Sequence, residues 1–570
     1  MKYYIVTILC LVTLPATSQN NPLFTPPMDL PIYLSGTFGE LRSDHFHSGI
    51  DIKTKGTTGH NVYAIERGYV SRVKVRAGGY GKALYIAHPN GYTSVYGHLE
   101  GYYKELADYI KKQQYREKTH EIDLYLDPET FPVTNKMVIG YSGNTGSSSG
   151  PHLHFEIRNT SNQHPLNVLA FDFPVEDRMP PEPRSVRLYP LDSESQIEQR
   201  SKIREFDLVE SSPNQYRVNR NEPIAVYGSI GIGMEVFDFL NGSHNKCGVY
   251  RLELQVDDQS IYLFRMDEFS FNESRYINAH IDYRERIENG RKIHRLYTLR
   301  HDPLPVYKHI IDRGILHITD TLQRDIRIIA SDIRGNRSEV TLSLKGQPAQ
   351  QKYARTKIEE GRLLTHTSGH TIKEKGITMR FAPYAFYEDI SFTFARTRSD
   401  DRFISDIFHI HETGTPVHKP FSLSMDIDKL SPEMQPKAIA VRIEEDGNLI
   451  PAGGSVKKDR LVTSVRSFGT YAVTLDTLAP DITPLNLQSG QDISGVPAIQ
   501  FIVRDDLSGI RRYEGYLDNS WVLFEFDPKN ELVFHTFDPQ RTSGNKVHEL
   551  ELYIEDDCGN KTVYHTQFRW

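Results

Sequence analysis

The second half of the chain alternates between hydrophobic and polar positions over short stretches bounded by turn residues. Residues 251–256 and 549–554 both alternate with a period of two, which is typical of β-strands with one buried face. Residues 331–336 and 555–560 each run from an aspartate into Gly-Asn before a second strand. Glycine and asparagine tolerate positive φ, so both segments predict β-hairpins. This spacing predicts immunoglobulin-like β-sandwiches.

The region between Gly36 and Arg158 also predicts a sheet. Asn90-Gly91 lies between two runs rich in β-forming residues, which is a strong hairpin signal. Helical periodicity is scarce, and the best candidate is residues 102–115, where Tyr102, Leu106, Tyr109 and Ile110 fall on one face. We interpret this segment as an amphipathic surface helix rather than a partner-binding one. The fold class is therefore mainly β.

Proline-rich breaks predict the domain boundaries. The clearest break spans residues 174–183, a weaker one lies at 345–351, and a third is suggested at 476–484. They predict a first domain over residues 19–174, an Ig-like β-sandwich over 175–346, a β-rich domain over 347–476 and a second Ig-like β-sandwich over 477–570.

The first 18 residues predict a cleavable signal peptide. Lys2 supplies the positive charge, residues 4–16 form a short apolar run, and Ala16-Thr-Ser precedes the expected cleavage point. A membrane anchor would need about 20 apolar residues, and Pro15 interrupts this run. No later stretch predicts a transmembrane segment. We expect an exported protein of the periplasm or cell envelope, or a secreted one.

Charge and cysteine content narrow the function classes. The formal charge of −7 is spread along the 570 residues without a basic cluster, which argues against a nucleic-acid partner. After signal removal only Cys247 and Cys558 remain, so neither a disulfide framework nor a Cys-X-X-Cys site is predicted. The acidic segment 505–509 has oxygen ligands suited to calcium, but a solvated turn is the favoured interpretation.

Two histidine motifs carry the candidate chemistry. The first is His47-Ser-Gly-Ile-Asp51, and the second is His152-Leu-His154-Phe-Glu156. Side chains alternate across a strand, so His152, His154 and Glu156 should share one face while the residues between them face the core. Two histidines and one aspartate suit catalytic zinc, which keeps three protein ligands and an open position for water. Either motif alone is a weak signal.

Together with their flanking glycines, the motifs resemble the lysostaphin/LytM zinc endopeptidases. The resemblance rests on His47-Ser-Gly-Ile-Asp51, on Gly78-Gly-Tyr-Gly, on Tyr96-Gly-His98-Leu, and on the run from Ser142 to Glu156, and it covers roughly residues 31–165. It implies a small antiparallel β-sheet metallopeptidase domain with a peptide-binding groove. It further implies that His47, Asp51 and His154 bind Zn²⁺, and that His98 and His152 are the catalytic histidines.

Some residues of this region have more than one interpretation. Which catalytic histidine acts as base and which stabilises the oxyanion is not assigned. Glu156 either orients a zinc ligand or is an ordinary exposed carboxylate. The Gly/Ser-rich run 142–150 is interpreted as a groove wall rather than a flexible linker. An insertion after His98, longer than is usual for the family, leaves substrate preference in doubt.

The leading hypothesis is a murein DD-endopeptidase that hydrolyses peptide cross-links of peptidoglycan. An exported protein without a surface-anchoring sequence favours D-alanyl to meso-diaminopimelate bonds, and a glycine bridge is the alternative. The runner-up is a non-catalytic LytM-like regulator of another hydrolase, which the presence of all five site residues disfavours. A third hypothesis is an adhesion or wall-binding module. The β domains after residue 174 could bind the wall, contact a partner or block the groove.

Overall fold

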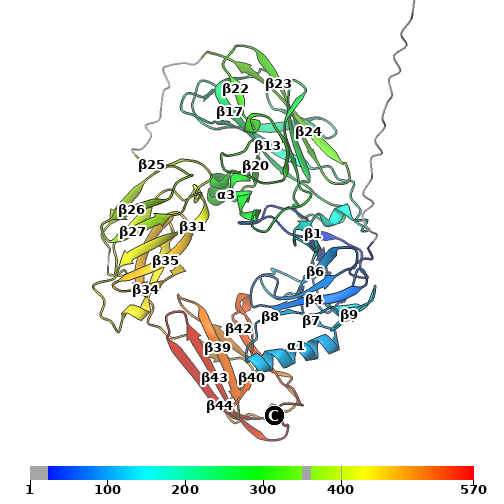
Figure 1. Ribbon diagram of the computed structural model, residues 1–570, viewed down its shortest axis with the longest axis vertical. Coiled ribbons are helices and arrows are strands. Elements are labelled where there is room, and N and C mark those ends of the chain that lie inside the picture. The colour runs from blue at the N-terminus through cyan, green and yellow to red at the C-terminus, as the bar shows by residue number, and fades with distance from the viewer. Residues whose placement is uncertain (1–23, 349–360, 400) are drawn as a thin grey trace, which may run out of the picture.

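The computed structural model describes residues 24–348, 361–399 and 401–570, so the predicted signal peptide lies outside the described residues. The fold is mainly β, with antiparallel pairing dominating its sheets. The strands fall into four successive units, which we define as residues 24–174, 182–346, 361–476 and 481–570. The units follow one another around a ring, from blue through green and yellow to red (Figure 1). Among the described residues, none of the helices has the length and apolar character needed to cross a membrane.

The first unit is built on a nine-stranded antiparallel sheet, with a small three-stranded sheet beside it. The large sheet contains, in spatial order, β1 (Leu34–Gly36), β2 (Ile50–Lys53), β11 (His152–Asn159), β6 (Tyr92–Leu99), β5 (Lys82–Ala87), β4 (Gly68–Val75) and β8 (Ile122–Tyr125), with β12 (Pro165–Leu166) on β11 and β9 (Pro132–Val133) on β4. The small sheet contains β3 (Asn61–Tyr63), β10 (Val138–Tyr141) and β7 (Gly101–Tyr102). One buried core, which includes Leu153 and Phe155, lies under these strands.

The two local predictions in this unit are confirmed. β5 and β6 form the hairpin expected at Asn90-Gly91, and Gly91 takes the left-handed conformation with φ of 85°. The predicted helix is α1 (Lys104–Glu117), which begins and ends two residues later than the sequence pattern indicates. It buries Leu106 and Ile110, as its amphipathic pattern requires. A short 3₁₀ helix, η1 (Val168–Ala170), follows the last strand.

The second unit is a single twelve-stranded sheet that includes two parallel pairings, β16–β24 and β17–β24. Its main path is β14 (Gln196–Ile197), β17 (Ile224–Phe237), β13 (Glu182–Pro190), β15 (Arg204–Ser212), β16 (Gln215–Val218), β24 (Arg337–Gly346), β23 (Gln323–Ser331), β18 (Arg251–Val256), β19 (Gln259–Arg265) and β21 (Tyr307–Ile310), and β20 (Ile293–Arg295) and β22 (Leu316–Ile318) pair with β17. Its helical segments are η2 (Ser274–Tyr276), α2 (Ile277–His280), α3 (Tyr283–Asn289) and η3 (Asp312–Gly314).

The third unit packs two five-stranded antiparallel sheets around one core. One sheet contains β26 (His370–Glu374), β27 (Ile377–Phe381), β31 (Pro416–Asp426), β35 (Arg460–Ser467) and β34 (Ser455–Lys457), and the other contains β29 (Phe394–Thr397), β30 (Ile407–Ile410), β36 (Gly469–Leu475), β32 (Ala438–Ile443) and β33 (Leu449–Gly453). A separate pair, β25 (Arg362–Leu364) with β28 (Ile390–Phe392), and a 3₁₀ helix, η5 (Gln435–Lys437), complete it.

The fourth unit is a sandwich of two four-stranded antiparallel sheets. The first contains β37 (Asp481–Pro484), β38 (Ala498–Arg504), β42 (Leu532–Thr536) and β41 (Glu525–Asp527), and the second contains β40 (Ser520–Val522), β39 (Ile510–Leu517), β43 (Val547–Asp556) and β44 (Lys561–Arg569), with η6 (Pro528–Asn530) preceding β42. Both predicted Gly-Asn hairpins are confirmed: β23 turns into β24 at Gly335, and β43 turns into β44 at Gly559.

The fourth unit docks on the first and closes the ring beside α1 (Figure 1). The Tyr115 ring lies edge-on to Trp521, with centroids 5.3 Å apart, and the Arg541 guanidinium lies 4.0 Å above the Tyr115 ring. Lys82 forms an ion pair with Glu525 at 2.8 Å. The insertion predicted from the sequence therefore forms part of the contact between the first and fourth units.

Replacing Tyr115 with Ala should loosen this contact. The variant loses an aromatic pair and a cation–π contact, together worth about 1–2 kcal/mol. We expect a larger radius of gyration by small-angle X-ray scattering. Tyr125→Ala is the matched control, because Tyr125 lies in the same insertion, is 74% exposed and stacks on Arg72 of its own unit. An unchanged radius for Tyr115→Ala would show that the contact does not hold the ring closed.

Candidate metal centre and active site

The pairing of β11 with β2 places the two histidine motifs side by side. Its register sets His154 opposite Asp51, and the neighbouring pair sets the apolar Phe155 opposite Ile50. Because side chains alternate across a sheet, the polar side chains share one face and the apolar ones enter the core. The predicted direction of the second motif is therefore confirmed, since Leu153 and Phe155 are fully buried in the core of the first unit.

Three side chains converge at the candidate metal centre. His47, Asp51 and His154 each offer one ligand atom, and these atoms lie within 4.8 Å of one another. His47 Nε2 lies 3.0 Å from Asp51 Oδ1, and His154 Nδ1 lies 3.0 Å from the same oxygen. Two imidazole nitrogens and one carboxylate, all buried, match the donor set of a catalytic zinc site.

Each candidate ligand histidine is held through its other ring nitrogen. His47 Nδ1 lies 2.8 Å from the carbonyl oxygen of Thr37, which leaves Nε2 facing the centre. His154 Nε2 lies 2.8 Å from Glu156 Oε1, which leaves Nδ1 facing it. Such outer partners fix the tautomer and the ring orientation of a metal ligand. Gly97, opposite His154 on β6, leaves room for that ring, because a Cβ there would lie 3.3 Å from His154 Cβ.

Of the two interpretations of Glu156 that the sequence allows, the structure excludes an exposed strand carboxylate. Its side chain is fully buried, and besides His154 it binds Arg158 Nε at 2.5 Å, the Tyr80 hydroxyl at 2.5 Å and the Ser48 hydroxyl at 2.6 Å. Burial alone would favour the neutral acid, but the charges of Arg158 and His154 hold the pKa of Glu156 below its usual range. Glu156 therefore stays ionised and orients His154.

The candidate catalytic histidines lie next to the three candidate metal ligands. The His98 and His152 rings are 4.8 Å apart, and His152 Nε2 lies 3.4 Å from Asp51 Oδ1. A backbone carbonyl holds Nδ1 of each ring at 2.8 Å, from Thr145 for His98 and from Gly150 for His152. In both rings Nδ1 is thus occupied and Nε2 is left for proton transfer, and Nε2 of His152 faces Asp51 of the candidate metal centre. Burial, reinforced by the charges of His154 and His152, lowers the pKa of His98 to about 3, so His98 is neutral at neutral pH.

A β-bulge aims His98. The register of β5 with β6 shifts between Lys82 and Leu84, so Gly97 and His98 are accommodated opposite one residue of β5. His98 takes the left-handed conformation, with φ of 58°. That conformation is uncommon for a residue other than glycine, and such strain concentrates at functional sites. Bulges also re-aim side chains beside active sites.

Several contributors were not found from the sequence. Arg158 continues the every-second-residue pattern of His152, His154 and Glu156, so its position on the same face was readable from the spacing. Arg42 gave no such signal, yet its guanidinium lies 2.8 Å from Asp51 Oδ2. The carbonyls of Thr37, Thr145 and Gly150 also gave none, because a backbone acceptor leaves no trace in residue identity.

The second unit clamps the loop that carries His47. The Phe46 amide donates to Ser274 Oγ at 2.8 Å, and Arg286 donates to the carbonyl oxygens of Arg42 and Ser43. Phe46 belongs to the core of the second unit rather than to that of the first. The loop is therefore positioned from outside its own sheet.

The fourth unit contacts the Gly/Ser-rich loop beside the two catalytic candidates. Lys529 Nζ donates to the carbonyl oxygens of Asn144 and Ser148. Ser148 Oγ in turn lies 3.2 Å from His152 Nδ1. This loop is packed rather than free, because a Cβ on Gly146 would lie 2.4 Å from the Gly79 carbonyl oxygen.

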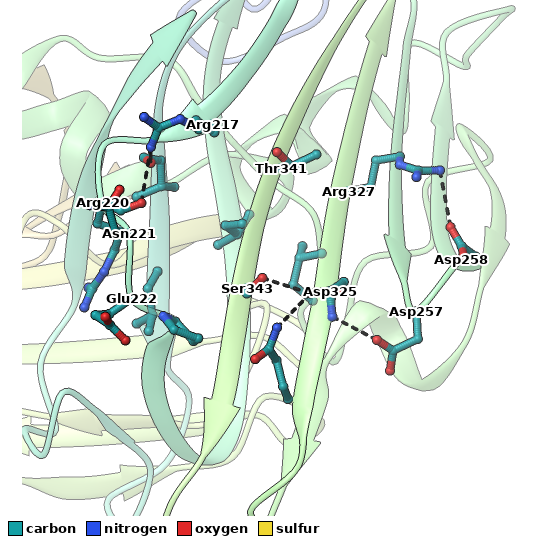
Figure 2. Close-up of a pocket in the computed structure, with 16 residues that line it drawn as sticks. Arg217, Arg220, Asn221, Glu222, Asp257, Asp258, Asp325, Arg327, Thr341 and Ser343 are labelled. Carbon is teal, nitrogen blue, oxygen red and sulfur yellow. Dashed lines mark hydrogen bonds and ion pairs between the residues drawn. The ribbon is translucent and has the colours of Figure 1, made fainter. Parts of the chain in front are cut away.

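A groove of about 820 Å³ is lined by residues of the second unit and by none of the five candidate site residues. Figure 2 shows the side chains that line it. Its acids and bases largely pair with one another. Asp325 accepts hydrogen bonds from Ser343 and Gln323, Asp257 accepts from the Asp325 amide, and Arg327 forms an ion pair with Asp258. These charges are satisfied locally, so the groove lacks the converging free groups that a catalytic site needs.

Comparisons with known proteins agree with the geometry. The profile of peptidase family M23 matches residues 45–115, and that of the Zu5-like domain matches residues 361–476. DD-carboxypeptidase/endopeptidase Mpg of Neisseria meningitidis serogroup B is 31% identical over 137 residues, which are 24% of this chain and 25% of that protein. An uncharacterised metalloprotease of Haemophilus influenzae is 31% identical over 123 residues, 21% of each chain. The chain thus spans about a quarter of the length of its curated relatives.

Among solved structures, the catalytic domain of lysostaphin from Staphylococcus simulans is 25% identical. It covers 23% of this chain and 82% of its own, with a TM-score of 0.16.

Zinc uptake at this centre should release a proton. Burial would lower the pKa of His154, but its hydrogen bonds to Asp51 and Glu156 outweigh burial and raise this pKa to about 9. Below that pH the metal-free ring is protonated, so a metal must displace the proton. Apparent zinc affinity should fall about tenfold for each pH unit below 9. Calorimetry in buffers of different ionisation enthalpy would count the proton, and a pH-independent affinity would contradict this charge state.

Replacing His154 with Ala should abolish stoichiometric zinc, because it removes one of the three converging donors. His164→Ala is the control, since His164 lies in the same unit outside the cluster. Metal content is measured by mass spectrometry of the purified proteins. A variant that keeps one zinc per chain would exclude His154 as a ligand.

Proposed function

We propose that this protein, whose N-terminal part is a peptidase domain of the LytM (M23) type, is a zinc-dependent endopeptidase that cleaves peptide cross-links of bacterial peptidoglycan. The observation that carries the proposal is the convergence of His47, Asp51 and His154 beside the rings of His98 and His152. The peptidoglycan substrate is supported by the M23 match and by the relative named as a DD-carboxypeptidase/endopeptidase.

The residues divide the chemistry between them. His47 Nε2, His154 Nδ1 and an Asp51 oxygen would hold the metal. Bound zinc would supply hydroxide at neutral pH by lowering the pKa of water toward about 7. His98 and His152 would then carry protons at Nε2, taking one from the nucleophilic water and giving one to the leaving amine, or stabilising the oxyanion. Their Nδ1 atoms are fixed on backbone carbonyls, so each ring keeps one orientation.

Arg42 and Glu156 would tune the centre from outside. Arg42 draws Asp51 Oδ2 away from the metal side, which favours a single Asp51 oxygen, Oδ1, as ligand. Glu156 holds His154 while Arg158 offsets its charge. The location in the periplasm or cell envelope and the secretory signal are part of the same proposal, because the substrate lies outside the cytoplasm.

Intact peptidoglycan tests the function directly. The full-length mature protein should convert cross-linked dimers to monomers, with the fragments identified by mass spectrometry. His152→Ala should lose at least about 100-fold in rate, the contribution of one acid–base group, while keeping its zinc. Cleavage by both proteins would remove His152 from the mechanism. Cleavage by neither would favour the alternative, a non-catalytic LytM-like regulator of another wall hydrolase.

The released fragments also identify the bond. D-alanyl to meso-diaminopimelate cleavage is the expected outcome, and cleavage of a glycine bridge would overturn that assignment. A wall-binding or adhesion role for the later units would appear as binding to peptidoglycan that survives His152→Ala.

The docked fourth unit should restrict the groove wall, because Lys529 fastens the loop that holds His98 and His152. Weakening the contact between the first and fourth units by about 1–2 kcal/mol raises the population of molecules in which this contact is broken by roughly 5- to 30-fold. Tyr115→Ala should therefore cleave soluble cross-linked dimers faster than wild type, by up to that factor. Tyr125→Ala should match wild type. Equal rates for all three proteins would exclude autoinhibition by this contact.

A further inference from the structure

Three aspartates meet where the chain passes from the first unit into the second. Asp177 lies in the linker, Asp238 directly follows β17, and Asp332 directly follows β23. One carboxylate oxygen of each lies within 4.8 Å of the other two. Calcium binds oxygen ligands at 2.3–2.6 Å, so oxygens on one ion are separated by up to about 5 Å. The spacing fits a single calcium ion between the three carboxylates.

Asp238 shows that this cluster is more than a solvated turn. Asp238 is only 4% exposed, and its Oδ1 has no hydrogen-bond partner among the residues that the structure describes. A buried carboxylate oxygen without a partner is costly unless a proton or a cation satisfies it. Burial and the charges of Asp177 and Asp332 raise the pKa of Asp238 well above its usual value.

The other two aspartates are already oriented. Asp332 Oδ1 and Oδ2 accept from the amide and the side chain of Asn336, at 2.9 and 2.6 Å. The same Asn336 side chain donates to the Asp177 carbonyl oxygen at 3.2 Å, which ties the linker to the end of β23. Burial and the charge of Asp332 raise the pKa of Asp177 to about 7. Without a cation, this cluster therefore retains protons that carboxylates normally lose.

We propose that Asp177, Asp238 and Asp332 bind one calcium ion, which locks the linker between the first two units. Three carboxylates and no nitrogen or sulfur donor favour a hard cation over zinc. Calcium suits this cluster better than magnesium, because it accepts irregular all-oxygen sites, whereas magnesium demands a near-ideal octahedron and keeps its waters.

The position gives the ion a structural consequence near the zinc centre. Asp238 pairs with Cys247 through two backbone hydrogen bonds, at 3.0 and 2.8 Å. The next residue, Gly248, donates its amide to Thr37 Oγ1 at 3.2 Å. Thr37 is the residue whose carbonyl oxygen holds His47. The ion would therefore anchor the segment that supports the loop carrying His47.

The same frame recurs between the third and fourth units. Asn560 binds both Asp556 oxygens, at 2.8 and 2.6 Å, and the Asp476 carbonyl oxygen at 3.1 Å, and Asp505 completes a triad within 4.8 Å. Here Asp476 accepts from the Ser508 amide and Asp505 from two further amides. Among the residues that the structure describes, this second triad has no fully buried aspartate oxygen without a hydrogen-bond partner, unlike Asp238 Oδ1 in the first. The proposal is therefore confined to Asp177, Asp238 and Asp332.

The test is calcium uptake by the zinc-loaded, full-length mature protein in calcium-free buffer. Bound calcium per chain is counted after equilibrium dialysis at about 1 mM, the weak end of affinities for extracellular calcium modules. Asp238→Asn should bind one ion fewer than wild type and lose the calcium-dependent rise in Tm. Asp258→Asn, an exposed aspartate of the same unit, should behave as wild type.

Two checks keep the test decisive. Asp238→Asn should keep its zinc and a cooperative unfolding transition, and Asp177→Asn in the linker should lose the same ion. The proposal is overturned if wild type takes up no calcium, if Asp238→Asn and wild type bind equal numbers of ions, or if magnesium at the same concentration displaces the ion.

Discussion

The register in which β11 pairs with β2 is the constraint on which the candidate active site depends. It sets His154 opposite Asp51, and it sends Leu153 and Phe155 into the core. A slip by one residue would turn every polar side chain of β11 into the core and every apolar one out of it. The apolar residues between the motif positions therefore fix where the histidines point. In this strand, the same register therefore sets both the burial of the apolar residues and the direction of the candidate metal ligand.

Burial of the polar face of β11 requires a charge balance. Glu156 is fully buried, and a lone carboxylate there would be strongly destabilising. Arg158 and His154 supply the compensating positive charge, and the Tyr80 and Ser48 hydroxyls satisfy the remaining acceptor positions. The same network that makes Glu156 tolerable also fixes the tautomer of His154. The stability of the unit and the orientation of His154 are therefore coupled at this residue.

Local patterns explain what the sequence could predict and where prediction stopped. The Asn90-Gly91 hairpin, α1 and the alternation of β11 are set by residues close in sequence, and all three are found in the structure. The contact of Arg42 with Asp51 and the docking of Trp521 on Tyr115 depend on tertiary placement. They leave no periodic signal in the chain. The burial of Glu156 was undecidable from the sequence for the same reason, since its partners Tyr80 and Ser48 arrive from other elements.

The three aspartates at the boundary between the first two units also depend on tertiary placement. Asp177 lies within the proline-rich segment 174–183, which predicts only a domain boundary, yet the Asn336 side chain binds its carbonyl oxygen and ties it to the end of β23. The nearest sequence signal for calcium was the acidic segment 505–509, because its acids are neighbours in the chain. Asp177, Asp238 and Asp332 are dispersed over more than 150 positions, so no local motif could reveal them. A chain of several β-rich units needs contacts that fix the orientation of neighbouring units, in addition to the core of each unit. Here the boundary between the first two units is linked to the candidate metal centre, because Gly248 donates to Thr37 and the Thr37 carbonyl oxygen holds His47.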